Sequence, residues 1–312
     1  MKKLKKIIAI NIIGLISVLF LIELISFLII FCRYYRLIVD GDQWTNWISF
    51  KNLNNIEDKY NFLPPYKYKG TDNKSIVILG CSYAIGACLD YEDTPSSQLA
   101  KYLKTTVYNK SIPGMGTASA LYVMSKDNIK EEIPDAKYFV YIFLDDHIRR
   151  NKCYIPNHIY NEFSAKYNLD KNNNLHFVKL NKLQYLLYSS YTFRLYDEYL
   201  RIKEDKEKDY LLLGAIITKL SEEIKTKYPN SKFIILFYDD NLNGRDINNI
   251  EHNKNLDQIC KKNNIQLIYT SDLKCGKDIL ERKYLTWDKI HPSKEVWQQI
   301  IPEFVKLTGM KK

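Results

Sequence analysis

A long apolar run near the amino terminus constrains this chain more than any other feature of its sequence. Residues Ile7–Cys32 read IIAINIIGLISVLFLIELISFLIIFC, and only Asn11, Glu23 and two serines interrupt the apolar side chains. About 20 apolar helical residues cross a hydrocarbon core of ~30 Å. A helix on the surface of a soluble protein has a polar face, whereas this segment is apolar nearly all round. The sequence therefore predicts a transmembrane helix over residues 7–32.

A cleavable secretory signal is the main alternative, because the chain begins with the basic stretch Met1–Lys6. The apolar run is longer than the usual signal core of about 7–15 residues, and no small-x-small cleavage site follows it. A lipoprotein signal that ends at Cys32 needs a small residue before the cysteine, but Phe31 stands there. The pattern favours an anchor that stays in the membrane.

The charges on either side of the run predict its orientation. Four lysines lie within residues 1–6, whereas only Arg33 and Arg36 follow the run closely. The positive-inside rule then makes residues 1–6 a cytoplasmic flank of a single span in the cytoplasmic (inner) membrane, with the rest of the chain outside. Glu23 lies inside the span, where it marks a partner helix or is accommodated by protonation or snorkelling. The sequence leaves these alternatives open.

After the span, the pattern of the chain changes twice. Residues 33–72 are rich in Tyr and Asn and contain Pro64-Pro65, so we interpret them as a connector. From residue 75 onward, short apolar runs rich in β-branched and aromatic residues follow one another. Such runs are typical of strands buried on both faces of a parallel sheet. The runs are Ser75–Leu79, Thr106–Tyr108, Tyr138–Leu144, Lys232–Tyr238 and Ile265–Tyr269.

Amphipathic stretches with helical spacing lie between these runs. Thr94 is expected to cap a helix that has Pro95 at its first position. Further helices are predicted at Thr117–Ile129, Leu211–Tyr228, Ile250–Lys262 and Lys294–Leu307. Alternating strands and helices predict an α/β fold over residues 73–312, a flavodoxin-like three-layer sandwich with a central five-stranded parallel sheet. Residues from about 150 to 210 show no strand signal and are interpreted as an insertion.

Composition excludes several classes of protein. The 312 residues carry a formal net charge of +10, and 46% are hydrophobic, so the chain is neither disordered nor collagen-like. The six cysteines show no C-x-x-C metal spacing. The basic residues are scattered and no nucleic-acid recognition element is evident, so we expect no nucleic-acid partner. A basic surface near an anionic bilayer or an acidic polymer is the simpler account.

Polar motifs follow the predicted strands at their carboxyl ends, where ligands bind in sheets of this kind. Gly80-Cys81-Ser82 follows the first run, and Asn109–Thr117 follows the second. Near the carboxyl terminus stands Asp288-Lys289-Ile290-His291. An Asp three residues before a His can hold one ring nitrogen, while the other ring nitrogen faces a nucleophile.

The order of these motifs resembles the SGNH (GDSL-type) superfamily of esterases and lipases. The first block, Ile78–Leu89, reads ILGCSYAIGACL where that family has a GDSxxxGxGL phrase. The resemblance implies that Ser82 is the nucleophile, that Asp288 and His291 are its acid and base, and that Gly114 is the glycine of the oxyanion hole. It also implies hydrolysis without a metal or organic cofactor.

The third block departs from the family, which has Asn-Asp after the third strand. Here the best register places Asp146 on the oxyanion-hole Asn. An ionised carboxylate there repels the oxyanion. The loss of one oxyanion-hole donor raises the activation free energy of the reaction by about 3–4 kcal/mol. The alternatives are a protonated Asp146, a hydrogen bond from His147, or a donor among residues 149–151. An interpretation of equal weight is that the charged side chains of Asp145–Arg150 only form a local salt-bridge cluster.

Together these inferences predict a membrane-anchored serine esterase. Its substrate is expected to be an O-acyl ester, such as an O-acetyl ester, of a cell-envelope glycan or lipid. If a sugar hydroxyl replaces water as the acceptor, the same Ser82, His291 and Asp288 make the chain an O-acyltransferase. A catalytically silent member that binds envelope glycans is the third alternative.

Overall fold

The structure is a computed structural model, and it separates the chain into two compact units. One unit comprises Met1–Asp42 and Lys179–Lys203, and the other comprises Gln43–Val178 and Glu204–Lys312. Each unit is described by itself. The residues that the structure describes are 2–35, 75–112, 114–152, 156–157, 162–163, 165–178, 187, 190, 192–193, 196, 205–238, 250–275, 285–286 and 291–311.

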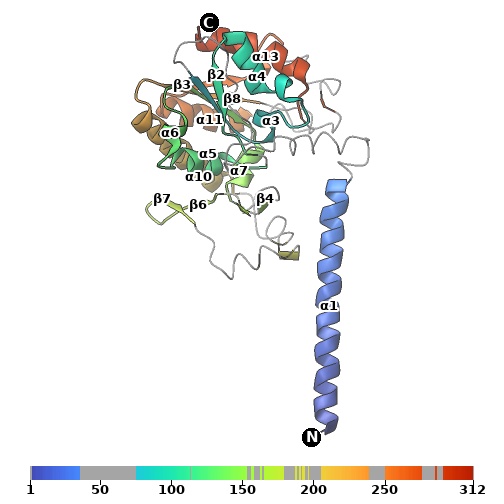
Figure 1. Ribbon diagram of the computed structural model, residues 1–312. Coiled ribbons are helices and arrows are strands. Elements are labelled where there is room, and N and C mark those ends of the chain that lie inside the picture. The colour runs from blue at the N-terminus through green and yellow to red at the C-terminus, as the bar shows by residue number, and fades with distance from the viewer. Residues whose placement is uncertain are drawn as a thin grey trace. The chain divides into compact units, whose positions relative to one another are not determined.

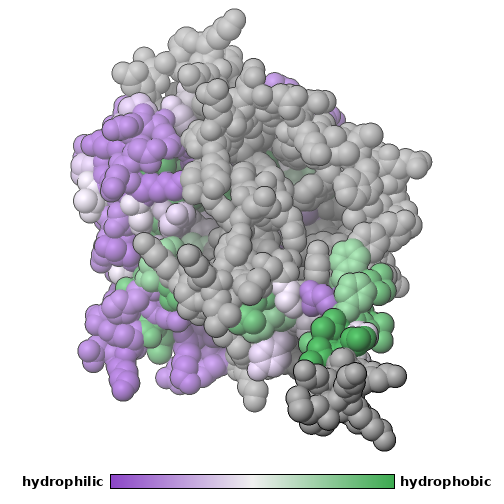
Figure 2. Space-filling view, turned by 60° about the horizontal axis from the view of Figure 1, so that its bottom comes forward, coloured by the Kyte–Doolittle hydropathy of each residue, from purple (hydrophilic) through white to green (hydrophobic). Residues whose placement is uncertain are grey.

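The first unit contains the amino-terminal helix α1, which spans Lys2–Tyr35 (Figure 1). Its stretch Asn11–Leu28 has a mean hydropathy of 2.3, and α1 is the one helix of the described chain that is long and apolar enough to cross a membrane. Large apolar side chains are exposed along this stretch, which forms the green column at the lower right of Figure 2. The predicted apolar helix of membrane-spanning length is confirmed, and its orientation stays a prediction.

The second unit is built on a five-stranded parallel sheet in the order β2-β1-β3-β8-β9. This order is the flavodoxin-like one, with the switch point between β1 and β3. The predicted fold class is therefore confirmed. The strands are β1 (Ser75–Leu79), β2 (Thr106–Asn109), β3 (Ala136–Phe143), β8 (Lys232–Phe237) and β9 (Gln266–Tyr269).

Helices cover both faces of this sheet (Figure 1). Because side chains alternate along a strand, Val77 and Leu79 of β1 pack into one core, and Ile76 and Ile78 pack into the other. The first core includes α5 (Thr117–Met124), α10 (Lys206–Lys227) and α11 (Ile250–Lys262). The second includes α4 (Pro95–Leu103) and α13 (Lys294–Thr308). Because the five strands are parallel, their carboxyl ends lie at one edge of the sheet, between these two cores.

Capping residues set the helix boundaries, and two of these differ from the sequence prediction. Thr94 caps α4 as predicted, since its Oγ1 accepts a 3.3 Å hydrogen bond from Ser97 N. The helix α10 begins five residues before the predicted Leu211. The Asp205 side chain caps it there, because its Oδ1 accepts a hydrogen bond from Lys208 N. The predicted helix at Thr117–Ile129 is two helices, since α5 ends at Met124 and the short α6 (Ile129–Glu132) follows.

Residues 150–210, which show no strand signal in the sequence, nevertheless contain short strands. One hairpin pairs β4 (Pro156–Asn157) with β5 (Glu162–Phe163), and another pairs β6 (Tyr167–Leu169) with β7 (Leu175–Phe177). In the second, the Asp170 carboxylate accepts hydrogen bonds from turn amides. Strands of two or three residues are too short to show a hydrophobic period. The predicted connector, residues 33–72, lies outside the described residues except for 33–35, which belong to α1.

Candidate active site

Ser82 lies at the carboxyl end of β1, as the first residue of the short helix α3 (Ser82–Ile85). The chain turns sharply before it, because Gly80 has a φ of +149°. A Cβ at Gly80 would lie 2.7 Å from Ala84 Cβ and 2.9 Å from the Ile142 carbonyl oxygen. Cys81 is fully buried among apolar side chains, whereas Ser82 is only partly buried. The turn therefore presents the Ser82 hydroxyl at the sheet edge and directs the Cys81 thiol into the core.

Substituting Gly80 with Ala is expected to lower the free energy of unfolding by about 2 kcal/mol, because it adds a strained φ and two close contacts. The loss is measurable as a lower midpoint of chemical denaturation. Gly214→Ala is the matched control. Gly214 lies inside α10, and its new Cβ would make ordinary contacts of 3.4 and 3.5 Å with the Ile259 side chain of α11, so this change should be neutral or mildly stabilising. Equal effects of the two substitutions would contradict the close packing at Gly80.

His291 contacts Ser82 directly, although the two are 209 positions apart in the sequence. Its Nε2 lies 2.8 Å from Ser82 Oγ, and its ring centroid lies 5.2 Å from that of Tyr83. The backbone of His291 is fixed by Thr286, whose N–H and hydroxyl both donate to the His291 carbonyl at 2.8 and 3.1 Å. A serine and an imidazole at this distance can exchange a proton. Asp288 lies outside the described residues, so its role as the acid stays a prediction.

The loop that carries Gly114 runs beside the loop that carries Ser82. Beyond the strands, Lys110 N donates to Ile78 O at 2.8 Å, and Ile112 N donates to Gly80 O at 3.0 Å. Gly114 and Ser82 each follow two residues after this last hydrogen bond, and Gly114 has a φ of +73°. The two loops therefore lie side by side at the same edge of the sheet.

Asn109 joins these two loops. Its side-chain amide donates to Ala84 O at 2.8 Å, and its Oδ1 accepts from Ser111 N at 3.1 Å. The sequence motif contained Asn109 without assigning it this role. Tyr83 was not predicted either, because nothing in its spacing indicates that its ring packs against His291.

Asp146 forms ion pairs within the helix α7 (Asp146–Arg150). Its Oδ1 lies 2.9 Å from Arg149 Nε, and its Oδ2 lies 2.6 Å from Arg150 Nε. Burial raises the pKa of Asp146, but the positive charges of Arg150 and Arg149 outweigh burial and hold this pKa well below its ordinary value. A carboxylate in that state has no proton to donate. The ion pairs favour the salt-bridge alternative, and the oxyanion role of Asp146 stays a prediction.

His147 is fully buried beside α5. Its Nδ1 lies 2.7 Å from the Tyr141 hydroxyl, which donates to Thr117 Oγ1 at 3.0 Å. Burial, helped by the charge of Arg150, lowers the pKa of His147 well below its ordinary value. The imidazole is therefore neutral near pH 7, and it packs against Tyr141 and Phe143.

The helix α7 packs directly on the loop of the second motif. Arg150 Nη1 donates to Met115 O at 3.4 Å, and Asn151 Oδ1 accepts from Ala118 N at 2.9 Å. A Cβ at Gly116 would lie 2.9 Å from Arg150 Cβ. Arg150 thus connects the Asp146 carboxylate to the residue next to Gly114.

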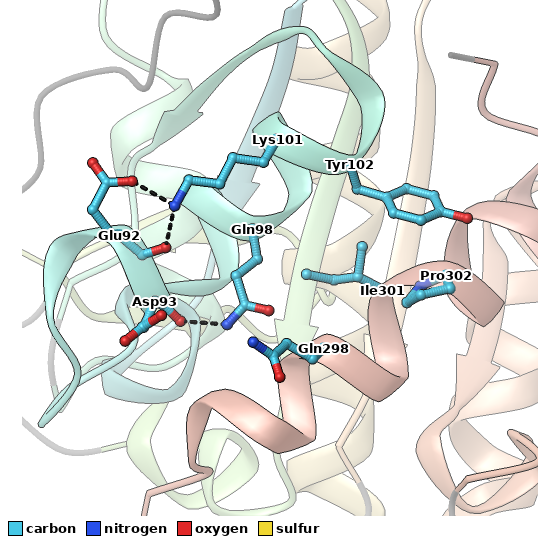
Figure 3. A pocket seen from close by; sticks show the side chains of 8 residues that line it. All are labelled: Glu92, Asp93, Gln98, Lys101, Tyr102, Gln298, Ile301 and Pro302. Atoms are coloured by element: carbon cyan, nitrogen blue, oxygen red, sulfur yellow. Dashed lines mark hydrogen bonds and ion pairs between the residues drawn. The ribbon is translucent and has the colours of Figure 1, made fainter.

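A cavity of about 360 Å³ lies apart from these groups, between α4 and α13 (Figure 3). Its polar side chains are paired within the cavity wall: Lys101 contacts Glu92, and the Gln98 side chain donates to the backbone carbonyl oxygen of Asp93 at 2.7 Å. Neither Ser82 nor His291 lines it. Within the described ranges no group of three or more His, Cys, Asp or Glu side chains is placed to hold a metal ion.

No protein-family model matches this chain, and no curated protein matches it. Solved structures do. TesA is 13% identical with a TM-score of 0.46, and the match covers 75% of this chain and 99% of TesA. A member of the lipolytic protein G-D-S-L family from Veillonella parvula is 12% identical (TM-score 0.46; 76% and 99% covered). A carbohydrate esterase is 13% identical (TM-score 0.45; 80% and 67% covered). Two of these three structures are thus named as a lipolytic protein and a carbohydrate esterase. At 12–13% identity these matches show a shared fold, so the chemistry of the site is inferred from the residues of this chain.

Proposed function

We propose that this protein is a membrane-anchored serine esterase that hydrolyses an O-acyl ester. The observation that carries the proposal is the 2.8 Å contact between Ser82 Oγ and His291 Nε2 at the carboxyl edge of a parallel sheet. Ligands bind at this edge in folds of this order. A serine gains nucleophilic strength when an adjacent imidazole accepts its proton.

In the proposed reaction, His291 takes the hydroxyl proton as Ser82 Oγ attacks the ester carbonyl. The backbone N–H groups of Ser82 and Gly114 stabilise the oxyanion, and Asp288 orients the imidazole. The protonated His291 then gives its proton to the leaving alcohol, which leaves an acyl group on Ser82. A water molecule, deprotonated by His291, releases the acid. A sugar hydroxyl in place of this water would make the chain an O-acyltransferase.

The substrate that we propose is an ester on a cell-envelope glycan or lipid. The helix α1 supports this, since it is long and apolar enough to keep the chain at a membrane. The lysines at residues 2–6 favour an amino terminus in the cytoplasm and a catalytic domain outside it. The net charge of +10 suits an anionic bilayer or polymer.

The test is active-site labelling of the full chain in detergent micelles with a fluorophosphonate, together with hydrolysis of an acetyl ester. We expect one label, on Ser82, and no label or hydrolysis with Ser82→Ala. The control is Ser231→Ala, which removes a hydroxyl that donates to Tyr228 O before β8, at the opposite edge of the sheet. It should be labelled like the wild type. A wild-type chain that is neither labelled nor active would refute the esterase and favour the glycan-binding alternative.

A further inference from the structure

A short part of one face of α1, around Ser26, is covered by protein. Glu23, Ser26 and Phe27 have the spacing i, i+3 and i+4, which places them on one side of α1. Ser26 is buried, with 6% of its surface exposed, while Leu24 and Ile25 between them are exposed. A polar face inside an apolar helix therefore has a partner within its own unit.

That partner is the segment around Ser190 and Thr192. The hydroxyls of Ser190 and Thr192 each donate to Glu23 Oε2 at 2.8 Å, and Thr192 N donates to the same oxygen at 3.2 Å. Ser26 Oγ lies 3.0 Å from Thr192 Oγ1. Three donors thus converge on one carboxyl oxygen from residues more than 160 positions away.

This contact lies at hydrocarbon depth if α1 spans the bilayer as predicted. Glu23 stands five residues before Leu28, the end of the most apolar stretch. At 1.5 Å per residue it is roughly 7–8 Å inside that end. An unpaired carboxyl group there is costly, because lipid offers it no hydrogen bond. The donors of Ser190 and Thr192 remove this cost only if their segment also enters the apolar layer.

The segment has the composition for such a position. Lys179–Lys203 contains six leucines, five tyrosines and one phenylalanine, and its central part Leu183–Leu195 carries a single charge, on Arg194. Charged residues flank this centre on both sides. Tyrosines are typical of the membrane interface, where the ring contacts lipid and the hydroxyl contacts water. Leu187 and Tyr196 expose 38% and 49% of their surfaces.

We propose that the segment marked by Leu187, Ser190, Thr192, Phe193 and Tyr196 is a second membrane-seated element, which docks on the Glu23–Ser26 face of α1 and places Leu187 and Tyr196 in the lipid at the carboxyl end of the span. This inference does not depend on the chemistry of Ser82.

The test uses the full chain in phosphatidylcholine nanodiscs and hydrogen exchange of the peptide that covers residues 183–195. Glu23→Leu is expected to speed exchange in this peptide about tenfold or more, because it removes the acceptor of three hydrogen bonds. Glu23→Gln keeps an acceptor oxygen and should retain the protection. Asn11→Leu is the matched control: it removes a polar group of the same helix twelve positions away and should change nothing. Leucine makes α1 more apolar, so failed insertion does not explain a loss of protection.

Lipid contact is tested in the same nanodiscs with a photoactivatable phospholipid. Crosslinks to residues 183–196 in the wild type, lost in Glu23→Leu, would support the proposal. Equal exchange rates in the wild type and Glu23→Leu would overturn the docking on α1. Protection of residues 183–195 from exchange without any lipid crosslinks would overturn the proposed position of the segment in the membrane.

Discussion

Replacing His291 by Ala is expected to lower kcat for ester hydrolysis by about 10⁴- to 10⁶-fold while the fold persists. The hydroxyl of Ser82 has little nucleophilic strength unless a base takes its proton, and His291 Nε2 is 2.8 Å from it. The His291 side chain is only partly buried, so its loss should cost little stability. The measurement is steady-state hydrolysis of an acetyl ester by the full chain in micelles, with circular dichroism as the check on folding.

The double variant Ser82→Ala/His291→Ala sharpens this expectation. Residues that act as one unit have strongly non-additive effects, so the double variant should be about as slow as either single variant. His176→Ala is the matched control, since His176 is an exposed histidine of β7 that pairs with Asp170. It should keep full activity. A double variant far slower than both single variants would show that Ser82 and His291 act independently, against the proposed mechanism.

The strands were predictable because most of them are buried on both faces. The runs at β1, β3 and β8 are nearly continuous apolar sequences, and their burial requires this. The hairpin β6–β7 was not predictable in the same way. Its strands have three residues each, and side-chain hydrogen bonds of Asp170 in the turn define it more than any hydrophobic pattern does.

The candidate site shows the same division. The contact of Ser82 with His291 was implied by the resemblance of the motif order to the SGNH superfamily, and the convergence of strand ends at one edge of the sheet is consistent with it. The state of Asp146 could not be inferred from that order. It depends on which of the neighbouring charges pair with the carboxylate, and only the geometry of α7 decides this. The contact of Glu23 with Thr192 was equally hidden, because no local pattern joins positions so far apart.

Replacing Asp146 by Asn is expected to lower the free energy of unfolding by about 3 kcal/mol at pH 7. The reason is that Arg150, whose side chain is 18% exposed, loses its ionic partner but remains largely buried. The midpoint of denaturation of the full chain in micelles, followed by tryptophan fluorescence, measures this loss. Glu92→Gln is the control: it breaks the exposed pair with Lys101 and should have little effect.

The pH dependence of this stability has a definite sign. The pKa of Asp146 is lowered in the folded state, so the folded chain binds this proton less readily than the unfolded chain does. The stabilisation by Asp146 is therefore complete above the unfolded value of about 4 and is lost as the pH falls below it. The difference between wild type and Asp146→Asn should shrink in that range. A difference that stays constant from pH 7 to pH 3 would contradict the ion pair.

Activity separates the two roles of Asp146. If its carboxylate holds Arg150 against Met115 O, beside Gly114, then Asn in its place should reduce kcat by about 10- to 100-fold, because small displacements of a catalytic loop are costly. This loss should appear under conditions where the variant is still folded. If instead Asp146 donates a hydrogen bond to the oxyanion, Asn is the better donor, and activity should be maintained or raised. The second result would restore Asp146 to the oxyanion hole and refute the role of its charge in positioning Arg150.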